Sequence, residues 1–309
     1  NLMRCFYSSD IDLKLDLPAS HPFQGDKYST SREVLLQNGI LRPEEIIDVS
    51  QTNLHVLKRV HDDQYLSKIY YGKLDRKEQL ALGLPANPQL YARCATEAEA
   101  TRQTCHAALA EGVAVCLAGG THHAFKQHGE GFSVFNDVAI AVRDLQEYQP
   151  GIRIMIVDTD AHQGNGTNSL LQDDPRVFTY SIHVGQTAST TSKVQGSMDV
   201  ETVRYVEGGM YLKQLFSTLA SALDVFNPDL VIWVAGADNH SNDLLGTMML
   251  NVADMKRRDD TIIRAFLRNR IPLAILYGGG YNRHPGLTAK LHRNTVASAK
   301  TIAAEFGKS

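Results

Sequence analysis

Short apolar runs alternate with longer amphipathic stretches along the chain. Runs of four or five apolar residues cover positions 113–117, 154–157, Leu230–Val234 and 273–277, and each is followed by aspartate, glycine or alanine. Runs of this length that are rich in β-branched residues are typical of strands buried on both faces. Since helical stretches separate them, the pattern predicts an α/β fold, a parallel sheet covered by helices on both faces.

The remaining elements follow from the same periodicity. Residues 3–7 and 177–182 suit two more strands, and helices are predicted over residues 54–70, 91–110, 210–226, 252–268 and 289–306. No repeat, low-complexity tract or Pro/Ser-rich linker divides the sequence. We therefore expect one domain over residues 1–309.

Chemically active side chains directly follow four of the apolar runs. They are Asp158, Asp160 and His162 after 154–157, His122 and His123 after 113–117, Asp238 after Leu230–Val234, and Tyr281 after 273–277 and three glycines. The carboxyl ends of parallel strands meet at one edge of a sheet, where α/β proteins keep their sites. Singly, an aspartate there is usually a helix cap and a glycine triplet a turn. Together they favour a functional site.

The spacing within one of these segments suggests a metal. Strand alternation places Asp158 and Asp160 on the same side, and the Asp160-x-His162 pair offers one carboxylate oxygen and one imidazole nitrogen to a divalent ion. The competing interpretation is a polar strand-to-helix turn.

Five motifs, in this order, resemble the zinc-dependent histone deacetylase superfamily, which has an arginase-like α/β fold. They are GGTHHA (119–124), GFSVFND (131–137), DTDAHQGNGT (158–167), AGADNHSNDLLG (235–246) and GGGY (278–281). The resemblance runs from about His21 to the C-terminal helix. The chain resembles the class IV branch and its bacterial relatives in HPFQGDKY (21–28), Gln163 and Asn165. Other classes usually carry His at the position of Gln163 and Asp at the position of Asn165.

The resemblance implies a metal centre. We expect Asp160, His162 and Asp238 to hold one Zn²⁺ per chain, because catalytic zinc usually takes three protein ligands and keeps one position open. Family members also bind a monovalent cation, K⁺, below the zinc. By resemblance its oxygens come from Asp158, Asp160, His162, Ser181 and Ile182.

Catalytic roles are carried over in the same way. His123 would take a proton from water and pass it to the leaving amine, with Asn165 facing its ring. His122 would be held by buried Asp158 and stabilise charge. Tyr281 would donate its hydroxyl to the oxyanion.

Substrate contacts are expected at Gly131, Phe132 and Gly279, where the family forms a narrow tunnel around the lysine methylenes, and at Asp63, which matches a rim aspartate that holds the substrate backbone. An exposed Asp63 without a function is an equal alternative. In relatives, a second aromatic residue commonly faces the one that matches Phe132. The loop 186–192 contains no aromatic residue. A wider mouth would admit longer acyl groups or a different amine.

These residues predict an amidohydrolase that removes acetyl groups, or longer acyl groups, from lysine side chains of proteins, histone tails among them. Acetylpolyamines and other small acylated amines are the alternative substrates. A catalytically silent acyl-lysine binding protein is a further alternative, although a reader needs no Tyr281. An arginase-like manganese pair is disfavoured because no second carboxylate-rich ligand set accompanies Asp238.

Composition narrows the class of protein further. The net charge of -3 and the pI of about 6.5 argue against direct nucleic-acid binding. Cys5, Cys94, Cys105 and Cys116 lack zinc-ribbon spacing and are interpreted as buried, reduced thiols of an intracellular protein. No run of about 18 apolar residues predicts a membrane span. We expect a cytoplasmic protein and favour a monomer.

Overall fold

The computed structural model describes residues 3–12, 15–185, 192–284 and 286–306. Within them a single parallel sheet has eight strands in the order β2-β1-β3-β8-β7-β4-β5-β6. The strands are β1 (Cys5–Tyr7), β2 (Ile46–Asp48), β3 (Val113–Cys116), β4 (Ile154–Asp158), β5 (Val177–Val184), β6 (Met198–Thr202), β7 (Leu230–Val234) and β8 (Leu273–Leu276).

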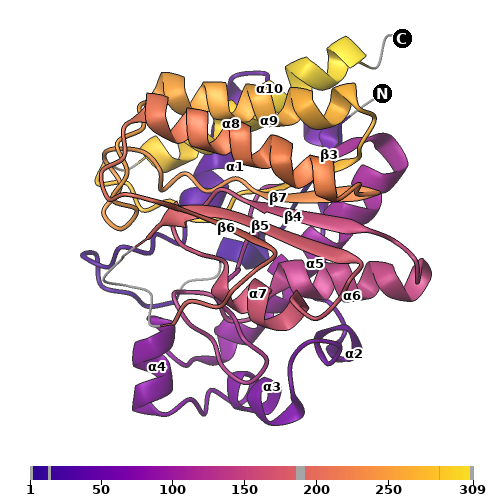
Figure 1. Cartoon of the computed structure of the whole chain (residues 1–309). Coiled ribbons are helices and arrows are strands. Elements are labelled where there is room, and N and C mark those ends of the chain that lie inside the picture. Colours follow the sequence, from indigo (N-terminus) through magenta and orange to yellow (C-terminus); the bar gives the residue numbers. More distant parts are fainter. Residues whose placement is uncertain (1–2, 13–14, 186–191, 285, 307–309) are drawn as a thin grey trace.

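Helices cover both faces of this sheet (Figure 1). One layer contains α1 (Lys27–Gln37), α8 (Gly208–Val225), α9 (Val252–Arg268) and α10 (Leu287–Phe306), and the other contains α5 (Pro88–Glu111), α6 (Asp137–Tyr148) and α7 (Asn165–Leu171). The shorter helices α2 (Leu54–Leu57), α3 (Asp63–Tyr70) and α4 (Arg76–Leu82) lie beyond the second layer. The predicted α/β fold with a doubly covered parallel sheet is confirmed.

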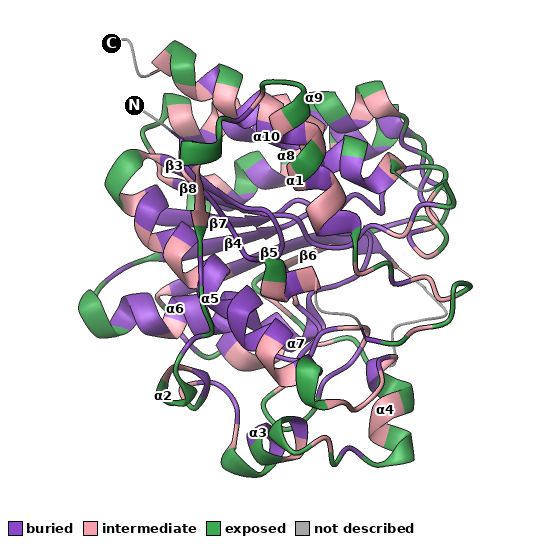
Figure 2. Ribbon diagram, turned by 180° about the vertical axis from the view of Figure 1, so that it is seen from behind, coloured by how far each residue is buried: buried purple, intermediate pink, exposed green. Residues whose placement is uncertain are grey.

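The four apolar runs singled out in the sequence are neighbours in the sheet. Strands β3, β8, β7 and β4 are consecutive, and every residue in them is buried. Figure 2 shows this buried centre between helices whose outer faces are exposed. Because all four strands run parallel, the segments that follow them meet at one edge. The fold thereby explains why residues far apart in sequence share a site.

One predicted helix is wrong. Residues 54–70 form two helices, α2 and α3, because the chain between them makes other contacts. The side chain of Asp62 accepts a hydrogen bond from the backbone N–H of Tyr65 and so caps α3. Just before it, the buried ring of His61 accepts a hydrogen bond from the backbone N–H of Asn136. Because the apolar periodicity continues from α2 into α3, the sequence pattern does not reveal the break between the two helices.

The structure also describes the four cysteines and the apolar content of the helices. Cys5, Cys94, Cys105 and Cys116 are free and buried, as predicted. No helix in the described part of the chain combines the length and apolar content needed to cross a bilayer.

Candidate active site

Three potential metal ligands lie close together just after the carboxyl ends of strands β4 and β7. Asp160 and His162 follow β4, Asp238 follows β7, and their ligand atoms all lie within 4.8 Å of one another. The imidazole Nδ1 of His162 lies 3.2 Å from Asp160 Oδ1 and 2.9 Å from Asp238 Oδ2. All three residues are buried. Two carboxylates and one imidazole are a donor set that fits Zn²⁺.

Electrostatics support a cation at this position. Burial and the negative charge of Asp160 raise the pKa of Asp238 to about 7. Keeping both buried carboxylates ionised therefore costs free energy. A divalent cation between them would remove that cost.

Gly279 lets the backbone approach this cluster closely. Its N–H donates to Asp160 Oδ2 over 2.7 Å, and a Cβ at this position would lie 2.6 Å from the same oxygen. A side chain here would displace Asp160. The predicted substrate-contact residue Gly279 therefore also orients a ligand carboxylate, besides lining the cavity.

The histidine pair stands beside the cluster in two different environments. His122 Nδ1 lies 2.6 Å from Asp158 Oδ2, whereas His123 Nδ1 lies 2.7 Å from the amide Oδ1 of Asn165. The two ring centroids are 4.1 Å apart, and Nε2 of His122 lies 3.7 Å from Asp160 Oδ1.

These environments separate the pKa values of the two rings. Although burial disfavours its charged form, the carboxylates of Asp158 and Asp160 raise the pKa of His122 to about 9. Burial, followed by the positive charges of His122 and His162, holds the pKa of His123 well below its ordinary value. One ring is therefore suited to carry charge and the other to accept a proton at neutral pH.

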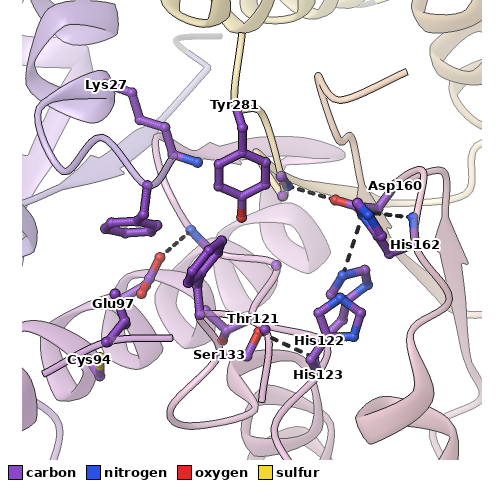
Figure 3. Close-up of a pocket in the computed structure, with 18 of the residues that line it drawn as sticks. Lys27, Cys94, Glu97, Thr121, His122, His123, Ser133, Asp160, His162 and Tyr281 are labelled. Atoms are coloured by element: carbon purple, nitrogen blue, oxygen red, sulfur yellow. Dashed lines mark hydrogen bonds and ion pairs between the residues drawn. The ribbon is translucent and has the colours of Figure 1, made fainter. Parts of the chain in front are cut away.

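Tyr281 follows the glycine segment after β8 and faces the same cavity (Figure 3). Its backbone N–H donates to Asp243 Oδ2 over 2.6 Å, and its ring packs on Phe132 at 5.4 Å between centroids. Asp243 also accepts hydrogen bonds from the backbone N–H groups of Leu245 and Gly246. This carboxylate thereby fixes the turn that positions the phenol.

A cavity of about 180 Å³ connects these groups, and its lining residues differ in exposure. The partly exposed ones are Thr121, Gly131, Phe132, Leu245 and Tyr281. Phe132 has φ +66°, and its ring also packs on His21 and Phe23, both at 5.5 Å. A second group of lining residues is buried, and we call the part of the cavity that they line its closed end. They are Phe23, Lys27, Tyr28, Leu84, Arg93, Cys94 and Glu97.

The structure does not bring every predicted residue to this cavity. Asp63 begins α3 and is paired with Lys58 at 3.0 Å; its side chain is 75 % exposed, and it is not among the residues that line the cavity. Ser181 and Ile182 lie buried on β5, where Ser181 pairs with Asp158 across the strands. The loop 186–191 lies outside the described residues.

Sequence reasoning missed two charged residues at this site, Lys27 and Glu97. Lys27 and Glu97 line the closed end of the cavity, and Asp243 holds the backbone of Tyr281. Asp243 was visible within AGADNHSNDLLG, but nothing in the sequence connected it with Tyr281. Lys27 belongs to HPFQGDKY, which the sequence marked only as a resemblance, and Glu97 lies in an ordinary helical context that carries no such signal.

The chain is similar to known proteins over most of its length. The histone deacetylase domain family matches residues 21–297. An uncharacterized protein of Picosynechococcus is 34 % identical over 88 % of this chain and 91 % of its own. Histone deacetylase 2 of Arabidopsis thaliana is 27 % identical over 89 % of this chain and 73 % of its own. The crystal structure of a histone deacetylase homolog complexed with SAHA has a TM-score of 0.80 at 19 % identity, covering 100 % of this chain and 89 % of that one.

Proposed function

The chain belongs to the histone deacetylase family, and on that premise we propose that it is a zinc-dependent amidohydrolase that removes acetyl groups from lysine side chains of proteins. One observation carries the proposal. Three buried metal-ligating side chains, two histidines with divergent pKa values and a tyrosine line or adjoin one cavity. We also place the chain in the class IV branch, on the basis of Gln163 and Asn165.

Asp160, His162 and Asp238 would hold the zinc ion. When bound, Zn²⁺ polarises the amide carbonyl and lowers the pKa of a water molecule, which supplies a nucleophile near neutral pH. Asp158, Ser181 and Ile182 would contribute oxygens to a potassium ion between β4 and β5, where Asp158 and Ser181 are paired. By the family resemblance, most of these oxygens would be backbone carbonyls.

His123 is the proposed proton carrier. Its low pKa keeps it neutral at pH 7, so it can accept the proton of the attacking water and return it to the leaving lysine amine. Asn165 Oδ1 accepts from Nδ1–H and thereby leaves Nε2 as the basic nitrogen. His122, which is charged beside Asp158, stabilises the negative charge that develops on the substrate.

Tyr281 would donate its hydroxyl to the developing oxyanion. Burial raises the pKa of Tyr281 well above its ordinary value, so the hydroxyl stays protonated and can donate. Its position is fixed by Asp243 from behind and by the ring of Phe132 beside it. Gly131 and Phe132 would form the wall along the lysine methylenes.

The partly exposed end of the cavity favours lysine over a polyamine. A polyamine substrate extends out of the cavity as a cation and needs carboxylates or stacked rings around it. The described lining residues that are partly exposed include no carboxylate, and Asp63 lies elsewhere; they are Thr121, Gly131, Phe132, Leu245 and Tyr281. A peptide-linked lysine, which carries no charge beyond its backbone, fits this mouth better.

Turnover of acetyl-lysine peptides and acetylpolyamines by one metal-analysed sample tests the proposal. We expect hydrolysis of the peptides with at most weak hydrolysis of the polyamines. The reverse preference would favour the small-amine alternative, and binding without turnover at full zinc occupancy would favour the silent binding protein. The monomeric state and the cytoplasmic location remain predictions from the sequence.

A further inference from the structure

The closed end of the cavity is charged, although the acyl group of the proposed substrate is apolar. Lys27, Arg93 and Glu97 line this end, and only 5 %, 2 % and 5 % of their surfaces are exposed. Burying charged groups is unfavourable unless polar partners compensate them. Buried charges that face a cavity are therefore candidates for ligand recognition.

Lys27 points toward the catalytic tyrosine from this end (Figure 3). Its Nζ lies 4.8 Å from the ring centroid of Tyr281, 5.0 Å from that of Tyr28 and 5.5 Å from that of Phe23. Aromatic faces attract an ammonium group electrostatically. They do not replace the hydrogen bonds that the ammonium group makes in water.

The ammonium group has more donors than the described residues provide acceptors. Lys27 can donate three hydrogen bonds, and to the described part of the chain it makes one, a long contact of 3.4 Å to the Gly280 carbonyl. Within the described ranges no carboxylate forms an ion pair with Lys27. Glu97, the lining carboxylate at this end, accepts from the backbone N–H of Gly119 at 3.0 Å. Spare donors of Lys27 can therefore reach an acceptor inside the cavity.

The group stays charged near neutral pH. Burial lowers the pKa of Lys27 to about 8, and the negative charge of Glu97 opposes that decrease. The arginine at this end, Arg93, lies over the rings of Phe23 and Tyr28 at 5.3 and 5.7 Å. Lys27 is thus the cation that packs directly against Tyr281.

The exposure of the lining determines which part of a substrate meets Lys27. A lysine side chain on a protein enters through the partly exposed end, past Phe132. Its amide then lies at the metal ligands and Tyr281, and the acyl group continues toward the buried end. The acyl group would then extend along Tyr281, whose ring centroid lies 4.8 Å from Lys27 Nζ.

We propose that Lys27 forms a recognition subsite for a hydroxyl group on the acyl chain, so that hydroxyacyl-lysines are better substrates than alkyl acyl-lysines of the same length. This inference rests on the proposed deacylase function. A neutral hydroxyl is favoured over a carboxylate because three carboxylates, Glu97, Asp160 and Asp243, act on Lys27 against one guanidinium, Arg93, so negative charge already predominates there. A long alkyl chain is disfavoured because it would remove water from the ammonium group without replacing its hydrogen bonds.

Peptides that differ only in one hydroxyl provide the test. We would measure kcat/KM for acetyl-, butyryl-, 3-hydroxybutyryl- and succinyl-lysine in the same peptide. A hydrogen bond from a charged donor typically contributes a factor of roughly 10 to 100. We therefore expect the 3-hydroxybutyryl peptide to exceed the butyryl peptide about tenfold or more, and the succinyl peptide to fall below the 3-hydroxybutyryl peptide.

Variants then assign the preference to Lys27. Lys27→Met should bring the ratio of 3-hydroxybutyryl to butyryl turnover close to one, and Lys27→Arg should keep most of it. Lys213→Met, which removes an exposed lysine of α8, is the matched control and should leave the ratio unchanged. If Lys27→Met does not fold, Lys27→Gln replaces it, with a ratio between those of Met and the unaltered protein.

The outcomes separate this inference from the proposed function. A ratio of one or less in the unaltered protein would overturn it, and so would a high ratio that survives in Lys27→Met. A preference for the succinyl peptide would overturn the assignment to a neutral hydroxyl. If Lys27 merely supports Tyr281, its loss would lower turnover of both peptides equally. Failure to hydrolyse any of the peptides would refute the deacylase function itself.

Discussion

Replacing Asn165 by aspartate changes the charge beside the proposed general base while nearly preserving shape. Asn165 Oδ1 lies 2.7 Å from Nδ1 of His123, and both side chains are buried. An aspartate oxygen at that distance would favour the protonated ring. An opposite charge this close typically raises a histidine pKa by about 1 to 3 units.

The surroundings of Asn165 place the expected shift at the low end of that range. Its Nδ2 donates to the Ser192 carbonyl at 2.9 Å and lies 3.4 Å from Glu130 Oε1. In Asn165→Asp both contacts become repulsive, which disfavours a fully ionised Asp at this position. His122, 4.1 Å away between centroids, also opposes a second positive charge. We expect a shift of about one unit.

The sign of the effect on activity follows from the role of His123. Burial keeps its pKa well below the ordinary value, so the neutral, active form persists into acid. Raising that pKa protonates the base at a higher pH. The acidic limb of kcat/KM should therefore move upward in Asn165→Asp, by about one unit.

The assay is kcat/KM for an acetyl-lysine peptide against pH, with zinc content measured at each pH. Asn168→Asp is the matched control, because Asn168 is buried on the same helix but donates to the Val194 carbonyl at 2.9 Å. Its acidic limb should stay in place. An unmoved or lowered limb in Asn165→Asp, or an equal shift in the control, would refute the assignment of Asn165 as the partner of His123.

Three further predictions concern the metal, the oxyanion and the stability of the fold. Asp238→Ala should lose both bound zinc and hydrolysis, because it removes one of three proposed ligands. Full zinc occupancy of this variant in metal analysis would show that Asp238 is not a zinc ligand. Tyr281→Phe should lower kcat about 100-fold with zinc retained, whereas a change confined to KM would mean that the phenol only contacts substrate. Although burial opposes it, hydrogen bonds from His106, Arg102 and Arg59 lower the pKa of Asp144 from 3.8 to about 2. That shift corresponds to at most about 2.4 kcal/mol, and solvent screening leaves about 1 kcal/mol. Because the folded pKa is depressed, this stability is present above about pH 4 and is lost as the pH falls through about 2. Urea unfolding of Asp144→Asn should therefore show the loss at pH 7 and little difference near pH 2.

The positions of the candidate metal ligands and of the two histidines were predictable because each follows a short apolar run. Asp160, His123 and Asp238 each come shortly after such a run, and a parallel sheet brings the carboxyl ends of its strands to one edge. The strand order was not needed for that conclusion. The structure adds that β3, β8, β7 and β4 are consecutive.

Tertiary packing explains what the sequence did not indicate. Lys27, at the start of α1, was noted only as part of the motif HPFQGDKY, and Glu97, within alanine-rich α5, resembles an ordinary charged helix residue. They face the cavity only because α1 and α5 pack beside the segment that carries Tyr281. Asp63, which a motif match placed at the substrate rim, is exposed beside Lys58 and does not line the cavity, so its contact with substrate stays a prediction.

Zinc titration of the metal-free protein tests the central claim most directly. Acetate release from an acetyl-lysine peptide would be followed as Zn²⁺ is added to the chelator-treated protein. Activity should rise linearly and level off at about one zinc per chain, with equal amounts of acetate and free lysine peptide formed. Hydrolysis that is equally fast without metal, or no hydrolysis at full zinc occupancy, would contradict a metal-dependent deacetylase.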